Sequence, residues 1–268
     1  MNGIDRSRRA AIVTGAARGV GAAVVTRLNA DGWSVVAVDR CADDPAVSYP
    51  LATVDQLHAT VAGCAAQDRV VPLVADVRDE RALHDATATA VREFGGLDAA
   101  VAAAGVMVGG PPLWEIDERH YRAAMDVNLD GVWRLARAAI PVMLARPEPR
   151  HGRFVAVASA AAHRAMPRLG AYAAAKAGVI GLVRGLAADL AASGVTAHAV
   201  SPGSTVTAML DASAEIYDLD DVNEFARHHL QARLLHPAEV AAAVAWLCGP
   251  ESSALTGSVL QVDAGLTA

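Results

Sequence analysis

The stretch "AAIVTGAARGVG", residues 10–21, joins a short apolar run to a glycine-rich turn. The run contains alanine and β-branched residues, which predicts a buried β-strand over residues 10–15. The turn carries Gly15, Gly19, Val20 and Gly21. A strand, such a turn and a helix in this order let backbone N–H groups approach a pyrophosphate at the positive end of the helix. The spacing is GxxxGxG, so the turn taken alone fits an ordinary tight connection equally well.

Six further apolar runs repeat this pattern, at residues 34–39, 70–75, 98–105, 152–159, 195–201 and 258–263. Longer alanine-rich segments, predicted to be helical, separate them. The runs are apolar throughout and do not alternate, which is typical of strands covered on both faces. The sequence therefore predicts an α/β fold with one Rossmann-type, doubly wound parallel sheet of about seven strands and helices on both faces. No linker divides residues 1–268, so we expect a single domain.

Two segments interrupt the alternation of strands and helices. Residues 41–52, "CADDPAVSYPLA", follow the second predicted strand and therefore begin near the expected cofactor. Tyr49 and Leu51 give this insertion an apolar face that can pack on a dinucleotide; the alternative is an ordinary surface loop. Residues 204–236 are predicted to hold two short helical pieces before a helix at 238–248, and to cover the substrate. Long insertions in compact domains are usually functional or disordered.

The composition excludes several classes of function. The 268 residues are 53% hydrophobic and 19% charged, with a net charge of −6 and no basic block, which argues against nucleic acid or an anionic membrane as a partner. No run approaches the ~20 apolar residues of a membrane span, and "MNGIDRSRRAAIVTG" lacks a run of signal length. The three cysteines show no framework, and the adjacent histidines of "RHHL", 227–230, point to different helix faces. We therefore expect a cytoplasmic protein without a metal site.

A carboxylate follows the second predicted strand and indicates which dinucleotide binds. Asp39 can accept hydrogen bonds from both ribose hydroxyls and would repel a 2′-phosphate, which favours NAD over NADP. Arg18 and Arg40 could instead pair with a phosphate, although solvated surface charges are their simpler interpretation. Asp76 and Val77 end the third strand. Asp76 either reaches the adenine or caps the following helix.

The sequence "YAAAK" places Tyr172 and Lys176 one helical turn apart. A phenol has a pKa of about 10, too high for an efficient base at neutral pH. A nearby ammonium group lowers that pKa, and the tyrosine can then take a proton from an alcohol or give one to a carbonyl. Ser159, at the end of the fifth strand, can hold the same oxygen. The alternative is a packing tyrosine beside a solvated lysine, but the serine and the glycine-rich turn favour catalysis.

Taken together, these motifs resemble the short-chain dehydrogenase/reductase family over nearly the whole chain. "TGAARGVG", "ADV", "MDVNLDGVW", Ser159, "YAAAK" and "SPGSTVT" occur in the family's order. The resemblance implies hydride transfer between a nicotinamide and an alcohol carbon, with NAD as the cofactor. It implies that Tyr172 is the acid/base, that Lys176 lowers its pKa and holds the nicotinamide ribose, and that Ser159 orients the substrate oxygen.

The resemblance also assigns roles to residues that composition and spacing leave open. Asn128 would support a water relay to Lys176, whereas the sequence alone favours a polar side chain satisfied within a helix. The carboxamide of the nicotinamide would be clamped by "SPGSTVT", with Pro202, Gly203, Thr205 and Thr207. After the fourth strand the family usually has Asn-Ala-Gly; here Ala103, Ala104 and Gly105 occupy those positions. Ala103 thus removes a local hydrogen-bond network, while Gly105 still lets the backbone pass close to the cofactor.

A narrower resemblance connects the chain to short-chain dehydrogenases coupled to mycofactocin, through "SYPLATVDQLHATV" (48–61), "SPGSTVTAML" and "AEIYDL". It implies that the insertion covers the NAD, which is held tightly and reoxidised by an external redox carrier. The family resemblance further implies a homotetramer that pairs through the helices carrying "MDVNLDGVW" and "YAAAK".

The expected substrate pocket is mostly apolar, with Met107, Met209 and Tyr217 beside Ser159, which predicts an uncharged secondary alcohol or ketone. His163 and Arg168 are expected at the surface. Two other functions stay open. One is a free-cofactor reductase of 3-oxoacyl or similar ketones, and the other is a non-catalytic dinucleotide-binding regulator.

Overall fold

A computed structural model describes residues 9–268 and contains one seven-stranded sheet. The strands are β1 (Ala10–Thr14), β2 (Ser34–Asp39), β3 (Val70–Val74), β4 (Ala99–Ala102), β5 (Arg153–Val157), β6 (Thr196–Pro202) and β7 (Val259–Val262). Their order is β3-β2-β1-β4-β5-β6-β7, and every neighbouring pair is parallel. The predicted parallel sheet is confirmed. Residues 1–8, which open the stretch "MNGIDRSRRAAIVTG", lie outside the described part of the chain.

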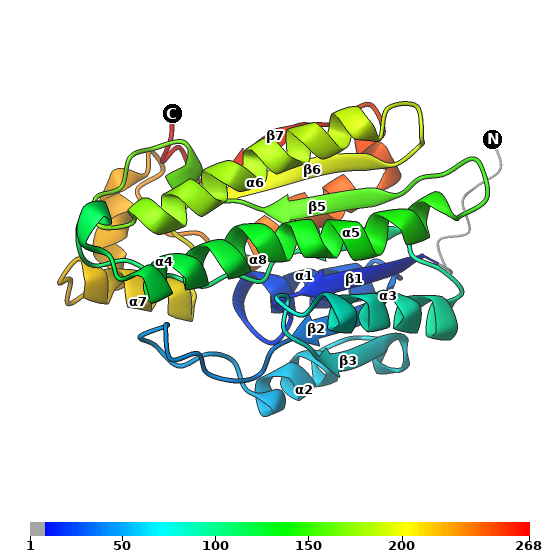
Figure 1. Ribbon diagram of the computed structural model, residues 1–268, viewed down its shortest axis with the longest axis horizontal. Coiled ribbons are helices and arrows are strands. Elements are labelled where there is room, and N and C mark those ends of the chain that lie inside the picture. The colour runs from blue at the N-terminus through cyan, green and yellow to red at the C-terminus, as the bar shows by residue number, and fades with distance from the viewer. Residues whose placement is uncertain (1–8) are drawn as a thin grey trace.

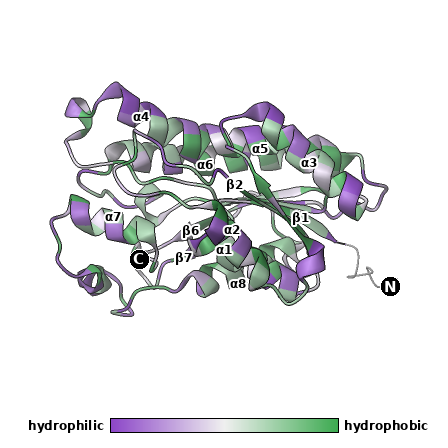
Figure 2. Cartoon of the chain, turned by 90° about the horizontal axis from the view of Figure 1, so that it is seen from below, coloured by the Kyte–Doolittle hydropathy of each residue, from purple (hydrophilic) through white to green (hydrophobic). Residues whose placement is uncertain are grey.

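Helices cover both faces of the sheet, as the continuous apolar runs predict (Figure 1). The helices are α1 (Gly19–Ala30), α2 (Val54–Ala62), α3 (Glu80–Phe94), α4 (Glu118–Met125), α5 (Gly131–Leu144), α6 (Gly170–Asp189), α7 (Ala208–Ile216) and α8 (Pro237–Cys248). Figure 2 shows α3, α5 and α6 on one side of the sheet and α1, α2 and α8 on the other. One buried cluster packs the first three helices on the sheet, and a second packs the other three. The five inner strands are therefore buried on both faces, whereas the edge strands β3 and β7 are partly exposed.

The chain reverses its direction of winding between β1 and β4, which lie side by side in the middle of the sheet. In open parallel sheets, ligands bind at the carboxyl ends of the strands beside such a point. The glycine-rich turn follows β1 there, and residues 103–105 follow β4. The fourth predicted strand, 98–105, is shorter in the structure because Thr14 Oγ1 accepts the N–H groups of Ala103 and Ala104, at 3.2 and 3.3 Å. The threonine thus ties β1 to the end of β4.

Both irregular segments lie at this same carboxyl edge of the sheet (Figure 1). Residues 204–236 contain α7 and a 3₁₀ helix at Val222–His228, which confirms the two predicted helical pieces before α8. The insertion 41–52 has no helix or strand, and α2 begins after it at a capping box formed by Thr53 and Gln56. Helix α6 has the length and apolar composition of a membrane span, but one of its faces, with Val179, Ile180 and Val183, packs in the buried cluster on the sheet.

Candidate active site

A cavity of about 550 Å³ opens at the carboxyl ends of the strands. Its wall contains these residues of the expected dinucleotide site: Gly15, Arg18, Gly19, Val20, Gly21, Asp39, Arg40, Asp76, Val77, Ala103, Ala104, Gly105, Pro202, Gly203, Thr205 and Thr207. It also contains Ser159, Tyr172, Lys176, Met107, Met209 and Tyr217. One continuous cavity therefore brings the predicted cofactor, catalytic and substrate residues together, with the exception of Asn128.

The glycine-rich turn packs its backbone so closely against neighbouring backbone that only glycine fits at two of its positions. Gly15 has a φ of 70°, and a Cβ added there would lie 2.7 Å from the Cα of Ala104. A Cβ on Gly21 would collide with the carbonyl oxygen of Gly15. Side chains are therefore excluded where the chain enters α1, whose N-terminus faces the cavity wall. This is the arrangement that a pyrophosphate needs.

The carboxylate of Asp39 is oriented by two backbone N–H groups, one from the glycine-rich turn and one from the start of the insertion. One carboxylate oxygen accepts the N–H of Ala17 at 2.9 Å and the other accepts the N–H of Cys41 at 3.2 Å. The side chain is thus fixed at the end of β2 and lines the cavity. An acceptor held in this position fits the hydroxyls of a ribose.

The two arginines near Asp39 are not solvated surface charges, contrary to their simpler interpretation. Arg18 donates from Nη2 to the carbonyl of Pro50 at 2.9 Å, and its guanidinium lies 5.8 Å from the ring centroid of Tyr49. Arg40 forms ion pairs with Asp44 at 2.8 Å and with Asp76 at 3.2 Å. Both arginines are therefore engaged within the wall of the site.

Asp76 does not cap the next helix, so that alternative is wrong. Asp79 caps α3 by accepting the N–H of Ala82 at 3.1 Å. Asp76 instead accepts the backbone N–H of Arg78 at 2.9 Å and pairs with the guanidinium of Arg78 at 2.7 Å. Burial alone would raise the pKa of Asp76, but these hydrogen bonds and the two arginine charges hold it below the ordinary value. The carboxylate thus stays ionised beside the cavity.

The insertion 41–52 forms one wall of the cavity and is not a loop that points away. Tyr49 is 8% exposed, and its hydroxyl accepts the N–H of Met107 at 3.0 Å. Its ring belongs to the same buried cluster as Met107 and Tyr172. Leu51 and Ala52 line the cavity as well. The insertion therefore crosses from the end of β2 to the segment after β4, beside the expected catalytic tyrosine.

Tyr172 and Lys176 lie on one face of α6 and are buried, at 6% and 3% exposed. Lys176 donates from Nζ to the carbonyl of Val157 at 2.8 Å, and Nζ is 5.8 Å from the ring centroid of Tyr172. Burial lowers the pKa of Lys176 to about 8. Burial also raises the pKa of Tyr172 to about 12, although a hydrogen bond with Ser159 opposes the rise. The charge of Lys176 is not among the causes of this shift, so the expected lowering of the phenol's pKa by the lysine stays a prediction.

Ser159 lies two positions after the end of β5 and caps the 3₁₀ helix that follows, Ala160–Ala162. Its Oγ accepts the N–H of Ala161 at 3.1 Å. Because one lone pair is occupied in this way, the hydroxyl proton is left to be donated toward the cavity. A fixed donor at this position suits an alcohol or carbonyl oxygen placed between Ser159 and Tyr172.

Asn128 lies behind the cavity, in a π-helical turn at Asp126–Asp130 between α4 and α5. Its side-chain oxygen accepts the N–H of Val106 at 3.0 Å, and its amide donates to the carbonyls of Val106 and Ala124. Only the last of these bonds is within the helical region, so the asparagine mainly fixes the chain after β4. A Cβ on Gly105 would lie 2.8 Å from Asn128 Oδ1 and 3.5 Å from Lys176 Nζ. Asn128 thus lies beside Lys176, and its part in a water relay stays a prediction.

The segment "SPGSTVT" is held by its own hydroxyls. Thr205 donates to the carbonyl of Gly203 at 3.0 Å, and Thr207 donates to the carbonyl of Thr205 at 3.1 Å. His229, which the sequence suggested only as a poor metal ligand, supports the same segment because its Nε2 accepts the N–H of Ser204 at 3.2 Å. Its Nδ1 contacts the carbonyl of Phe225 at 3.0 Å. No cluster of three or more metal-binding side chains occurs within residues 9–268.

The substrate end of the cavity is less uniformly apolar than the sequence predicts. Met209 Sδ lies 3.9 Å from the Tyr172 hydroxyl, and Tyr217 donates to the carbonyl of Pro167 at 2.7 Å. The wall also contains the basic residues Arg164, Arg227 and His228, of which sequence reasoning missed Arg227 and His228. The run "RHH" at 227–229 was the available signal for two of them. His163 and Arg168 are exposed, as expected, and neither lines the cavity. His163 contacts the hydroxyl of Ser201, and Arg168 forms an ion pair with Asp218.

Comparisons with known proteins agree with this geometry. The family model described as enoyl-(acyl carrier protein) reductase matches residues 15–267. An uncharacterized NAD-dependent oxidoreductase from Mycobacterium tuberculosis is 37% identical, over 96% of this chain and 95% of that protein. (−)-trans-Carveol dehydrogenase from Rhodococcus erythropolis is 32% identical over 96% of each protein. The crystal structure of carveol dehydrogenase from Mycobacterium avium in complex with NAD has a TM-score of 0.91 at 33% identity, covering 96% of this chain and 97% of that one.

Proposed function

The chain belongs to the short-chain dehydrogenase/reductase family, and we propose on that premise that it transfers a hydride between NAD and a secondary alcohol or ketone. It is an NAD-dependent oxidoreductase, as its relatives are. One observation carries the proposal. Ser159, Tyr172 and Lys176 line the same cavity as the glycine-rich turn and Asp39. A reacting carbon and a dinucleotide can therefore meet inside it.

NAD supplies a hydride acceptor or donor at its nicotinamide ring. In the direction of alcohol oxidation, Tyr172 takes the hydroxyl proton, and Ser159 donates a hydrogen bond to the same oxygen. A buried phenol with a pKa of about 12 needs a nearby positive charge to become a phenolate near neutral pH. Lys176, with its pKa lowered to about 8, still carries that charge at pH 7. The lysine is thus the group that makes the phenol usable as a base.

The test of this assignment is Tyr172→Phe, which removes only the hydroxyl. Turnover should fall at least ~10²-fold, the low end for a general acid–base group. NAD binding and the far-UV circular dichroism spectrum should change little, because the ring still fills its place in the buried cluster with Tyr49 and Met107. A variant that turns over within a few-fold of the parent would show that another group transfers the proton.

We also propose that NAD is held tightly and reoxidised in place by an external carrier of the mycofactocin type. The support is the insertion 41–52, which contributes Tyr49, Leu51 and Ala52 to the cavity wall and contacts Arg18 and Met107. The free thiols Cys41, Cys64 and Cys248 agree with a cytoplasmic location, which is likewise part of the proposal. The experiment is to pass the protein through gel filtration and measure the NAD that remains.

A second candidate is a reductase of 3-oxoacyl or similar ketones that exchanges NAD freely. The basic residues Arg164, Arg227 and His228 in the cavity wall favour it, because they can bind an anionic group on a larger substrate. Rapid exchange of bound NAD with added NADH, together with faster reduction of 3-oxoacyl esters than of simple ketones, would select this candidate over the first.

A further inference from the structure

Three arginines contact the insertion, and two of them, Arg18 and Arg40, also line the cavity. Arg18 donates to the carbonyl of Pro50. Arg40 and Arg78 both pair with one oxygen of Asp44, each at 2.8 Å. Arg18 and Arg40 line the cavity together with Asp39, where the ribose of the dinucleotide is expected to bind, whereas Arg78 joins Arg40 through Asp44 and Asp76. The insertion therefore supplies the partners of the cations at this end of the site.

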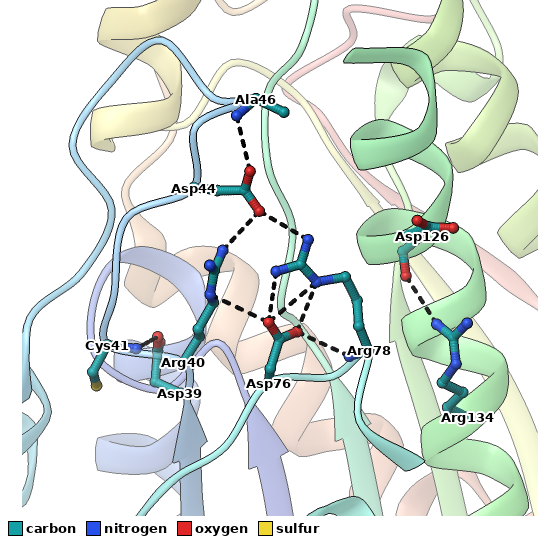
Figure 3. Close-up of polar contacts among 9 residues, drawn as sticks. All are labelled: Asp39, Arg40, Cys41, Asp44, Ala46, Asp76, Arg78, Asp126 and Arg134. Carbon is teal, nitrogen blue, oxygen red and sulfur yellow. Dashed lines mark hydrogen bonds and ion pairs between the residues drawn. The ribbon is translucent and has the colours of Figure 1, made fainter. Parts of the chain in front are cut away.

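Asp44 lies between Arg40 and Arg78 and contacts both of them (Figure 3). It is 9% exposed, and its other oxygen accepts the backbone N–H of Ala46 at 2.9 Å. Asp76 completes the cluster from the end of β3, since it pairs with Arg40 Nε at 3.2 Å and with Arg78 Nη2 at 2.7 Å. Two guanidinium groups and two carboxylates thus form a cluster whose formal charges cancel. Arg40 and Asp76 are at the same time part of the cavity wall.

The cluster affects which dinucleotide can bind. A guanidinium is a preferred partner of phosphate, because its charge and its forked donors match the phosphate oxygens. An arginine whose donors already meet buried carboxylates must break those bonds before it can bind a phosphate. Its charge is also neutralised locally, so it attracts a 2′-phosphate less. Arg40 and Arg78 are in that situation, and Asp44 contacts both.

We propose that Asp44 is a specificity-determining residue that excludes NADP by occupying Arg40 and Arg78. This role differs from that of Asp39, whose own charge opposes a 2′-phosphate. Asp44 acts through the arginines: if its charge is removed, the cluster retains two cations and one carboxylate, and a net positive charge is left beside the ribose site. Selectivity would then depend on a residue of the insertion as well as on the end of β2.

Asp44→Asn tests the proposal, because the amide keeps an acceptor for Ala46 and loses the charge. Asp43→Asn is the matched control. It lies in the same insertion, its carboxylate accepts the N–H of Leu51 at 2.8 Å, and it forms none of the arginine ion pairs described above. Dissociation constants of NAD and NADP are measured at equilibrium by displacement of bound NADH, followed through its fluorescence. In Asp44→Asn the ratio of the NADP constant to the NAD constant should fall roughly tenfold, the size of one charged hydrogen bond.

The control should leave that ratio within about twofold of the parent. The triple variant Asp44→Asn/Arg40→Ala/Arg78→Ala should lose most of the gain in NADP affinity, because both released guanidinium groups are gone. If Asp44→Asn does not fold, as judged by circular dichroism, Asp44→Ser serves the same comparison. Equal ratios for the Asp44 and Asp43 variants, or a gain that survives the removal of both arginines, would overturn the proposal. Since only NAD and NADP affinities are measured, the result is independent of the substrate and of any external carrier.

Discussion

His198 shows at the scale of one residue what the sequence does not reveal. It lies in β6, fully buried, and Nε2 contacts the hydroxyl of Thr196 at 3.0 Å. Within residues 9–268, Nδ1 has no hydrogen-bond partner. Burial and the positive charge of Arg153 lower the pKa of His198 from 6.5 to about 4. Between pH 6.5 and about 4, the imidazole is therefore neutral in the folded protein and protonated in the unfolded chain.

This shift predicts a loss of stability in mild acid. Between pH 6.5 and about 4 the unfolded chain binds a proton that the folded chain does not, so the free energy of unfolding falls as the pH falls. One pKa unit corresponds to about 1.4 kcal/mol, so the loss is at most about 3 kcal/mol. Urea denaturation at pH 7 and at pH 4.5 measures this loss. The free energy of unfolding should fall less between the two pH values in His198→Gln than in the parent protein, because glutamine does not titrate. The exposed His84→Gln is the control, and an equal acid loss in parent and His198→Gln would contradict the prediction.

Other residues divide between those the sequence predicts and those it cannot. Tyr172, Lys176 and Ser159 follow from short motifs, because helical spacing and strand ends place them together. The raised pKa of Tyr172 does not follow from the sequence, because it is caused by burial of the phenol, which is a property of the folded chain. The cluster around Asp44 also escapes prediction, because Arg78 comes from a separate loop 34 positions along the chain.

At the scale of elements, the insertion 41–52 has the clearest consequence. Contacts of Tyr49 with Met107 and of Pro50 with Arg18 hold it in the cavity wall, and under the proposal that it covers NAD, release of the cofactor requires it to open. Replacing residues 41–52 by a short turn should increase the NAD dissociation rate roughly tenfold or more, since at least one charged hydrogen bond is lost. Stopped-flow displacement of NADH measures this rate.

The control replaces the loop 146–151 by a short turn. This loop joins α5 to β5 at the amino ends of the strands, away from the cavity. The replacement should leave the NAD dissociation rate unchanged. If the parent protein itself releases NAD within seconds of dilution, the insertion does not retain the cofactor. The free-cofactor reductase would then be the better account of the chain.

The elements themselves are largely predictable, and the reason is physical. Strands buried on both faces must be apolar throughout, so seven runs mark seven strands, and all seven are found. Their ends are harder to predict. β4 stops at Ala102 because Thr14, on a neighbouring strand, binds the next two N–H groups. The path of the insertion is likewise decided by contacts with Met107 and Arg18 and not by its own sequence.

At the scale of the whole molecule, α5 and α6 present a surface suited to a second copy of the chain. Gly181 and Gly185 on α6 would each carry a Cβ into open space, and Trp133 on α5 is 44% exposed. Helix α6 is apolar enough for a membrane span but only 39% buried in the most apolar part of its length. A partner helix can approach closely over small residues, which supports the proposed homotetramer with two-fold axes.

Light scattering at micromolar concentration should therefore give about four times the chain mass of 27.6 kDa. Gly181→Glu places a charge on the open face of α6 and should shift the mass toward smaller species. The fold of each chain should be unaffected, because the added side chain meets nothing and glycine is a poor helix former. A parent protein with the mass of one chain, or a variant that keeps four, would contradict this arrangement.

The most direct test of the proposed reaction follows the hydride itself. The protein is incubated with NAD and a panel of cyclic and acyclic secondary alcohols that carry deuterium at the carbinol carbon, and the NADH is analysed by mass spectrometry. We predict deuterium in the NADH from at least one alcohol, formed at least ~10²-fold more slowly by Tyr172→Phe. NADH that forms without the label, or no NADH from any alcohol of the panel, would contradict hydride transfer from a secondary alcohol in this cavity.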